Sequence, residues 1–339
     1  MVKFENIIGH ERIKKYFSHL IEQDNLSPSY LFYGPEGVGK STLALEIAKA
    51  YNCESTEIRP CGECPTCRKF SKLIHPDLVV LYPSRPENLR ALAIDQGKLK
   101  PDKFDPTKNI TIDQVRELQL ELTKAPFMAK KRFVLFLYAD NLTVEAQNAL
   151  LKTLEEPPDN TIFILISSNI GKILPTIRSR CRLVKFSSLK FEEFRQYPFT
   201  TQYPLPLLYR LSDGSIGRAQ KLLESEFLPI RIDILNALAE KDAASFTEAL
   251  RNRIFSRDQL QDFLKIYMSI VRDLLLAKSN SENLLVNVDL KTLIKAVAKK
   301  LSYRDIERLI NNGYEAENYA GRFLNTESIM LSLAEIFIF

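Results

Sequence analysis

The sequence lacks the two features that would direct a protein into or across a membrane. No apolar run among its 339 residues approaches the roughly 20 residues that a transmembrane helix needs. The first residues, Met-Val-Lys-Phe-Glu-Asn, also lack the apolar core of a secretory signal peptide. These absences predict a cytoplasmic protein without a membrane partner, whose five cysteines do not form structural disulfides.

The sequence also lacks a strong charge imbalance. Its 47 Lys and Arg residues exceed its 42 Asp and Glu residues by five, which gives a net charge of +5. This mild excess permits contact with nucleic acid but does not require it, because a mixed-charge surface gives the same balance. There is no clearly delimited basic stripe interleaved with aromatic residues, which a dedicated nucleic-acid-binding module would need. The length is sufficient for two or three domains, each with its own core.

A phosphate-binding loop is the clearest motif that the sequence contains. Residues 34–41 read Gly-Pro-Glu-Gly-Val-Gly-Lys-Ser, after the apolar run 30–33 and before the helical pattern of 42–49. This strand–loop–helix context is what the motif G-x-x-x-x-G-K-[ST] requires. Backbone N–H groups would surround the phosphates, Lys40 would reach the terminal phosphates, and Ser41 would hold magnesium. The predicted ATP and magnesium ligands in this loop are Gly34, Gly37, Gly39, Lys40 and Ser41.

The acidic residues that an ATPase needs beside this loop are missing from the expected place. They should stand at the end of a second apolar strand, and the run 132–138 ends in Leu137 and Tyr138. Neither side chain can bind magnesium or orient a water molecule. Asp140 lies close by and could substitute if the strand register differs by a few residues, or it could be a simple turn residue. The sequence therefore predicts nucleotide binding with weak or absent hydrolysis.

Four of the five cysteines are clustered with the spacing C-x7-C-x2-C-x2-C. They are Cys53, Cys61, Cys64 and Cys67. Two overlapping C-x2-C steps place three thiols on a tight turn, for which Gly62 and Pro65 supply the turn chemistry. Four thiolates suit a structural zinc ion, with no position left open for catalysis. An iron–sulfur cluster takes the same ligands, and four buried thiols without metal are the remaining alternative. Cys181 stands apart and is predicted to be a small core residue.

The N-terminal half alternates between strand and helix patterns. Strands are expected at 30–33, 77–82, 132–138, 161–167 and 183–186, and helices at 111–122 and 143–155, with Thr111 as an N-cap. Residues 84–109 are rich in Pro, Lys and Asp and are expected to form a long surface insertion. The alternation implies an α/β fold, a parallel sheet with helices on both faces.

The remainder of the sequence is expected to be helical. From residue 188 onward there is no convincing strand, and residues 191–226 resemble a small helical module interrupted by Pro198, Pro204 and Pro206. Amphipathic helices are expected at 229–240, 244–254, 257–278, 290–300, 303–315 and 326–338. The final run 329–339 is apolar on more than one face, so it should pack in a core or a subunit contact.

Several stretches together resemble the bacterial clamp-loader ATPases of the AAA+ class. They are Phe4-Glu-Asn-Ile-Ile-Gly-His10, the phosphate loop, the cysteines inserted after it, His75-Pro76-Asp77, Asn148-Ala-Leu-Leu-Lys-Thr-Leu-Glu-Glu-Pro-Pro158, Thr176-Ile-Arg-Ser-Arg-Cys181 and Asp213-Gly-Ser-Ile-Gly-Arg218-Ala. The resemblance covers residues 1–226 well and the rest by architecture only. It implies an AAA+ P-loop domain over 1–187 with a zinc-binding insertion at 53–67. A helical lid over 188–226 and a helical oligomerisation (collar) domain over 227–339 would follow.

The resemblance also implies a catalytic role for Arg180. This residue matches the arginine finger that the family projects into the ATP site of a neighbouring subunit. A guanidinium suits this role because it stays charged and binds phosphate oxygens bidentately. The alternative is that Arg180 is an ordinary surface arginine or the partner of a carboxylate near a strand start.

Further residues match polar positions of the family. Thr42 joins Lys40 and Ser41 among the nucleotide and magnesium contacts, and Arg218 matches the phosphate-sensing arginine of the lid. Ser168 and Asn169 stand where the family has a polar sensor at a strand end. Arg218 could instead be a solvated arginine in the first turn of a helix, and Ser168 and Asn169 could form a turn with its own hydrogen bonds.

Within this family, a chain that lacks the acidic pair resembles the delta-prime subunits of the DNA polymerase III clamp loader. The gamma/tau subunits normally keep an Asp-Glu pair. The resemblance implies a stator that binds gamma/tau and delta subunits in a hetero-oligomer. Through that complex it would help ATP-dependent loading of the sliding clamp onto primed DNA. The alternatives are an ATP-hydrolysing motor subunit of the gamma/tau type and a zinc-stabilised nucleic-acid-binding module.

Overall fold

The computed structural model describes residues 1–83, 108–225, 227–240 and 257–321, with positions 242, 244, 246, 247 and 333 described singly. The chain forms two compact units, Met1–Glu193 and Phe194–Phe339. The predicted helices 244–254 and 326–338, and all but the last two residues of the predicted insertion 84–109, lie outside the continuously described ranges. The expected division into three domains stays a prediction.

The first unit is built on a five-stranded parallel sheet with the strand order β2-β3-β4-β1-β5. The strands are β1 (Ser29–Tyr33), β2 (Leu78–Leu81), β3 (Arg132–Phe136), β4 (Thr161–Ser167) and β5 (Arg182–Lys185). β1 lies between β4 and β5, so that Leu31 is opposite both Leu165 and Leu183. All five predicted strands are present, which confirms the predicted α/β class.

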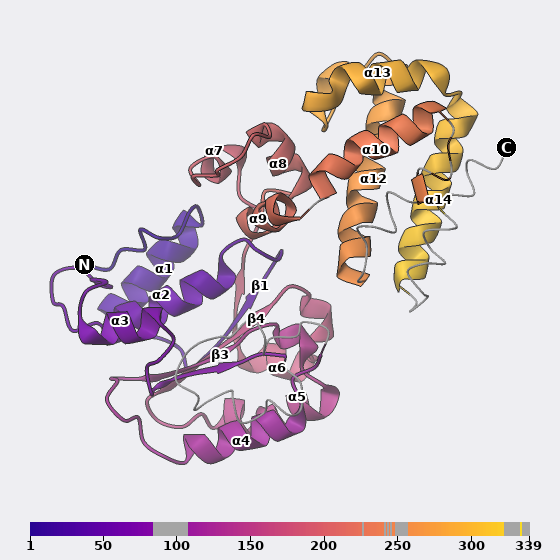
Figure 1. The fold of residues 1–339 in the computed structure, drawn as a ribbon. Helices are drawn as coiled ribbons and strands as arrows, with labels where there is room; N and C mark the ends of the chain where they lie inside the picture. Colours follow the sequence, from indigo (N-terminus) through magenta and orange to yellow (C-terminus); the bar gives the residue numbers. More distant parts are fainter. Residues whose placement is uncertain are drawn as a thin grey trace. The chain divides into compact units, whose positions relative to one another are not determined.

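Helices cover both faces of this sheet, as the alternation of the sequence predicts (Figure 1). The helices are α1 (Glu11–Glu22), α2 (Lys40–Asn52), α3 (Pro65–Ser71), α4 (Ile112–Leu122), α5 (Val144–Glu155) and α6 (Pro175–Arg180). Side chains of β1 alternate between the faces: Tyr30 and Phe32 join a core with α1, α2 and α3. Leu31 joins a second core with α4, α5 and α6. The helix predicted to follow Thr111 does begin there, and the Thr111 backbone N–H donates to Gln114 Oε1 at 2.8 Å.

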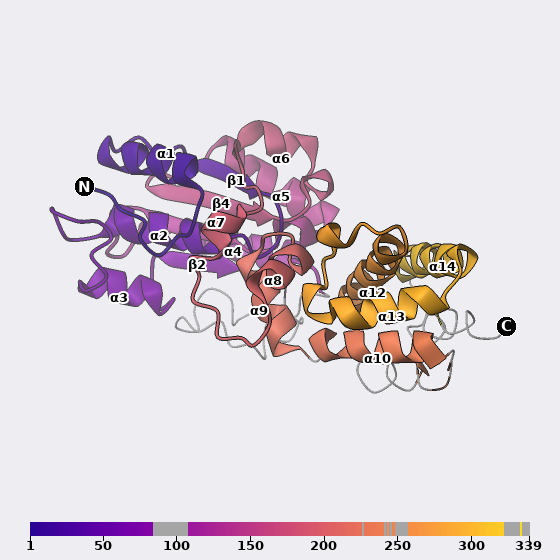
Figure 2. The same cartoon turned by 90° about the horizontal axis from the view of Figure 1, so that it is seen from above.

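The second unit is helical throughout its described residues. Its helices are α8 (Leu205–Leu211), α9 (Ile216–Glu224), α10 (Phe227–Glu240), α12 (Arg257–Lys278), α13 (Lys291–Lys300) and α14 (Tyr303–Gly321), while the short α7 (Phe191–Phe194) ends at the start of this unit. Four of the predicted helices are confirmed: 257–278 matches α12, and α14 runs six residues beyond the predicted 303–315. Helices α10, α12, α13 and α14 share one apolar core, and Figure 2 shows them side by side.

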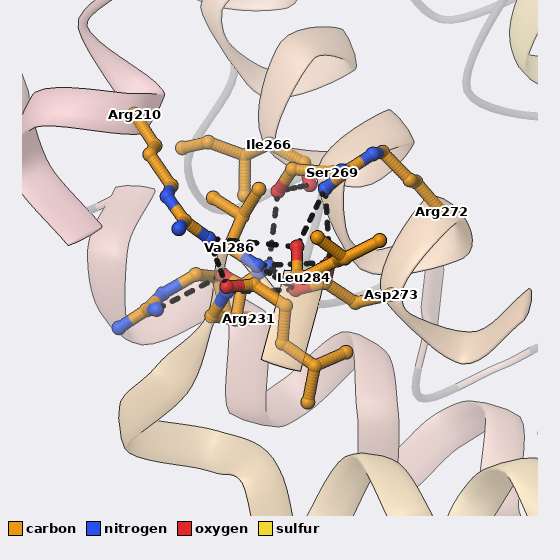
Figure 3. A network of polar contacts seen from close by, with 10 residues as sticks. Arg210, Arg231, Ile266, Ser269, Arg272, Asp273, Leu284 and Val286 are labelled. Carbon is orange, nitrogen blue, oxygen red and sulfur yellow. Dashed lines mark hydrogen bonds and ion pairs between the residues drawn. The ribbon is translucent and has the colours of Figure 1, made fainter. Parts of the chain in front are cut away.

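A buried polar network joins the elements of the second unit (Figure 3). The Arg231 side chain, 1% exposed, donates from Nη1 and Nη2 to the two carboxylate oxygens of Asp289 at 3.0 and 2.7 Å. Asp273, which is fully buried on α12, accepts from the backbone N–H groups of Val286 and Asn287. Arg210 of α8 donates to the Leu284 carbonyl. Charged hydrogen bonds thus hold segment 284–289 against α8, α10 and α12.

Among the described helices, none combines the length and the apolar character that crossing a bilayer requires.

Candidate nucleotide and metal sites

The phosphate loop connects β1 to α2, as predicted. Its three glycines all have positive φ angles, 144° at Gly34, 74° at Gly37 and 100° at Gly39. Other residues rarely adopt this backbone region, so the glycines let the loop turn tightly. Gly34 has a second constraint, because a Cβ there would lie 2.1 Å from the Phe186 carbonyl oxygen. The backbone conformation therefore requires the glycines of the motif.

The loop lysine lies folded over its own loop. Lys40 is 6% exposed, and its Nζ donates to the carbonyl oxygens of Gly34 at 2.6 Å and Pro35 at 2.5 Å. Ser41 and Thr42 follow in the first turn of α2, and both are exposed. The two hydroxyls can therefore reach a ligand at the helix N-terminus, whereas a phosphate would compete with the carbonyl partners of Lys40.

A histidine from the N-terminal segment supports the loop. His10 Nε2 lies 2.8 Å from the Val38 carbonyl oxygen, and the imidazole ring packs edge-on against Phe186. Because a carbonyl only accepts, the proton of the neutral imidazole belongs on Nε2. Burial lowers the pKa of His10, which favours this neutral form. His10 is the last residue of the segment 4–10 that contributes to the family resemblance, and its contact with Val38 joins this segment to the phosphate loop.

Leu137 and Tyr138 directly follow β3, at the end of the predicted strand 132–138. Leu137 packs against the core on the α1–α3 side of the sheet, and Tyr138 has a left-handed backbone with φ of 57°. Asp140 follows in a single turn of 3₁₀-helix, and its Oδ1 accepts from the Ser168 N–H at 3.0 Å. This carboxylate therefore ties the end of β3 to the end of β4.

The predicted polar sensor forms a turn at the end of β4. Asn169 Oδ1 accepts from the Gly171 N–H at 3.0 Å, and the Asn169 N–H donates to Ser167 Oγ at 3.0 Å. Such side-chain-to-backbone bonds are typical of turns. The sensor role of Ser168 and Asn169 stays a prediction.

Arg180 is the last residue of α6, and Cys181 alone separates it from β5. Its side chain is 31% exposed and forms an ion pair with Glu155 at the end of α5. Its Nη1 donates to the Thr176 carbonyl oxygen at 2.9 Å, one turn earlier in α6. The structure thus contains the carboxylate partner that the sequence left open as an alternative. Its role toward a neighbouring subunit stays a prediction.

Arg218 lies in the first turn of α9 in the second unit. Ser215 caps this helix, and Arg218 Nη1 lies 3.3 Å from the Asp213 carboxylate. At 31% exposure the guanidinium remains partly open to solvent. Its role as a phosphate sensor stays a prediction.

The four clustered cysteines converge as the spacing predicts. The Sγ atoms of Cys53, Cys61, Cys64 and Cys67 all lie within 4.8 Å of one another, and the Cys61 and Cys67 sulfurs are 4.0 Å apart. Tetrahedral ligands at about 2.3 Å from zinc would be about 3.8 Å apart, so this donor set fits a zinc ion. Gly62 turns the chain between the ligands with φ of 76°.

Backbone amides support this cluster. The N–H groups of Cys64 and Cys67 donate to the sulfurs of Cys61 and Cys64, both at 3.3 Å. The Cys64 N–H lowers the pKa of Cys61 to about 7, whereas burial raises the pKa of Cys53 and of Cys67. A cation would stabilise all four as thiolates, since metal ligation deprotonates a thiol.

Comparison with known families follows the two structural units. The family model described as "DNA polymerase III, delta subunit" matches residues 9–190, and the model for the C-terminal part of such subunits matches residues 225–332. The chain belongs to the DNA polymerase III delta-subunit family. This family member has the parallel α/β unit with a phosphate loop and the helical C-terminal region that the resemblance predicts.

Individual relatives of this delta-family chain include both delta-prime and tau subunits. It is 27% identical to the delta-prime subunit of Bacillus subtilis (strain 168), over 94% of this chain and 93% of that protein. It is 28% identical to the tau subunit of the same organism, over 73% of this chain but only 36% of that protein. A gamma subunit-related protein of Thermotoga maritima superposes with a TM-score of 0.47 at 18% identity, covering 95% of this chain and 98% of that one.

Three features of this delta-family chain escaped the sequence reasoning. They are the bond between His10 and Val38, the identity of Glu155 as the carboxylate partner of Arg180, and the buried network of the second unit. Each depends on contacts between residues at least 25 positions apart in the sequence, which spacing rules do not reach. For the Arg180 partner the sequence offers one partial signal. Glu155 is an acidic residue at the C-terminus of a helix, where the helix dipole disfavours a negative charge and a nearby cation is favourable.

Proposed function

We propose that this chain is a stator of the DNA polymerase III clamp loader, which supplies Arg180 to ATP bound by a neighbouring gamma/tau-type subunit. The end of β3 is the observation that carries the proposal. Leu137 and Tyr138 stand there in place of acidic residues, and the nearby Asp140 carboxylate accepts a backbone N–H. A chain with this arrangement is poorly equipped to activate water, so its contribution lies in binding and in assembly.

The position of Arg180 supports a role in trans. Arg180 is the last residue of α6, and 31% of its side chain is exposed. A guanidinium offers a rigid fork of donors that matches phosphate oxygens, and it remains charged at all working pH values. Removal of such a finger lowers phosphoryl transfer by roughly 10³- to 10⁵-fold in systems where it has been measured.

The remaining sites support assembly of the complex. We propose that the phosphate loop, with Lys40, Ser41 and Thr42, binds ATP and magnesium, and that Arg218 reads its phosphates from the lid. The four cysteines would hold a structural zinc ion. The same proposal includes domain boundaries at 187 and 226 and contact with gamma/tau and delta subunits. It also includes action on the sliding clamp and primed DNA through the complex, and a cytoplasmic location.

Substitution of Arg180 tests this function in the assembled complex. Arg180→Ala should leave the chain folded and able to join gamma/tau and delta subunits, but should depress the DNA- and clamp-stimulated ATPase. Arg180→Lys should rescue poorly, because an ammonium cannot form the bidentate contact. Arg178→Ala removes the same charge from the same helix and is the matched control. Unimpaired ATPase and clamp loading with Arg180→Ala would refute the role in trans.

A further inference from the structure

Arg180 does not extend from α6 but lies folded between its own helix and the end of α5. Its Nη2 forms the ion pair with Glu155, and its Nη1 donates to the Thr176 carbonyl oxygen at 2.9 Å. Both terminal nitrogens of the guanidinium therefore have partners within the chain. In this conformation a phosphate that binds both terminal nitrogens competes with these two acceptors.

Glu155 is placed where a carboxylate is unfavourable without a cation. It is the last residue of α5, and the C-terminal end of a helix carries a partial negative charge. The Arg180 guanidinium compensates both this partial charge and the Glu155 carboxylate. The Arg180 guanidinium therefore offsets a carboxylate at the end of α5 where the helix dipole disfavours it.

We propose that Glu155 is the positioning residue of Arg180: it holds the guanidinium in the unassembled chain and releases it to a neighbour's phosphate. This inference rests on the proposed function of Arg180 in trans. A bidentate phosphate contact can use the Nη2 group that Glu155 holds, so phosphate and the Glu155 carboxylate compete for this nitrogen. Glu155 therefore competes with the ATP of the neighbouring subunit.

The ion pair between Arg180 and Glu155 is weak enough for Arg180 to exchange Glu155 for another anion. The Glu155 and Arg180 side chains are 47% and 31% exposed, and ion pairs at such sites are weak because water and salt screen them. Within the described part of the chain, the buried Nε atom of Arg180 also has no hydrogen-bond partner. A bidentate phosphate contact would satisfy the guanidinium more fully.

A charge-removing pair of variants separates this role from a general charge effect. Glu155→Gln keeps the shape of the side chain but weakens its hold on Arg180. Glu156→Gln makes the same charge change at the adjacent exposed residue and is the control. The arginine side-chain NMR signal of Arg180 in the isolated chain, assigned by its loss in Arg180→Ala, reports the contact directly. It should shift and sharpen in Glu155→Gln and not in Glu156→Gln.

The assembled complex reports the competition. At fixed ATP, Glu155→Gln should raise the DNA- and clamp-stimulated ATPase about two- to fivefold, the range that a weak exposed ion pair permits. The increase should disappear in an Arg180→Ala background, and Glu156→Gln should leave the rate unchanged. A purely structural role for Glu155 would instead lower the rate in both backgrounds.

The outcomes distinguish this inference from the proposed function. An Arg180 NMR signal that does not move in Glu155→Gln would overturn the holding contact. A moved signal with an unchanged or lowered ATPase would overturn the release step, provided that Arg180→Ala depresses the ATPase. If Arg180→Ala has no effect on the ATPase, the trans role itself fails, whatever the NMR signal shows.

Discussion

Lys40 donates from Nζ to the Gly34 carbonyl oxygen at 2.6 Å, so the lysine that should contact phosphate is held by the first residue of its own loop. The Pro35 carbonyl oxygen, at 2.5 Å, is a second acceptor. These two bonds satisfy an ammonium that is almost fully buried, since an unpaired buried charge would be costly. A bound triphosphate would replace neutral acceptors with anionic ones, which form stronger bonds.

Nucleotide binding should therefore depend on Lys40, whereas hydrolysis should be weak. The purified chain should show at most trace magnesium-dependent ATPase, because Leu137 and Tyr138 supply no carboxylate. Lys40→Ala should abolish ATP binding measured by calorimetry or a fluorescent analogue. The control is Lys15→Ala, which removes an exposed lysine. Lys49→Ala, in the same helix as Lys40, is less suitable because Lys49 pairs with Glu46 in the core. Robust turnover that disappears in Asp140→Ala would show that Asp140 serves as the missing acid.

The stability of the chain should fall in mild acid because of His10. Burial lowers the pKa of His10 below its ordinary value of 6.5. The unfolded chain therefore binds a proton at higher pH than the folded chain, and stability declines as pH falls below about 6.5 until the lower folded pKa is passed. His10→Gln keeps a donor for Val38 without titrating, so its midpoint of thermal unfolding should change less between pH 7.5 and 5.5.

The exposed His19 provides the control for this pH dependence. His19→Gln should retain the full decline of stability seen in the parent chain, because the His19 side chain stays exposed in the folded chain. Burial also lowers the pKa of His75, so a smaller decline should persist in His10→Gln. Equal pH slopes for the parent chain and His10→Gln would contradict the assignment to His10.

The loop before β3 should depend on the buried Asp77 carboxylate. Asp77 is 1% exposed and accepts the backbone N–H groups of Phe127, Met128 and Ala129 at 2.6 to 2.8 Å. Asp77→Asn replaces one acceptor oxygen by a donor that faces other donors, so the variant should lose about 1–3 kcal/mol of unfolding free energy. Urea denaturation measures this loss. Asp113→Asn, at an exposed carboxylate, should change stability little, and an equal loss there would contradict the specific role of Asp77.

The layered fold could be predicted from the sequence because its signals are local. The apolar runs of β1, β3 and β4 and the glycines of the phosphate loop depend on residues within a few positions of one another. The cysteine cluster could also be predicted, since four ligands within 15 residues leave few ways to converge. The spacing alone could not reveal what holds each functional side chain.

The contacts that position these side chains are long-range. Arg231 is a charged residue on a mostly apolar helix, and only the fold shows that Asp289, 58 residues later, neutralises it. Arg180 likewise meets Glu155 across 25 residues. Such pairs require that two helices pack in one particular geometry, which periodicity does not specify. The predicted surface insertion at 84–109 lies almost wholly outside the described residues, so that prediction is not tested.

The cysteine site should hold one metal ion and should also secure the N-terminus. Arg59, between Cys53 and Cys61, forms a parallel bridge with Val2. The Lys3 N–H donates to the Arg59 carbonyl oxygen at 2.9 Å, and the Arg59 N–H donates to the Met1 carbonyl oxygen at 3.0 Å. Because the four sulfurs converge within 4.8 Å of one another, elemental analysis should find about one zinc per chain, as a four-thiolate site binds.

Loss of one ligand should release this pairing as well as the metal. Cys64→Ser should lower the zinc content and the midpoint of thermal unfolding, because metal binding contributes directly to folding. Hydrogen exchange at Lys3 and Arg59 should accelerate in the same variant, since their bonds depend on the order of the loop between Cys53 and Cys61. Cys181→Ser, at a cysteine outside the cluster, should keep both the zinc and the slow exchange. A metal-free protein with unchanged exchange and unfolding midpoint would contradict the zinc assignment and leave four buried or half-buried thiols.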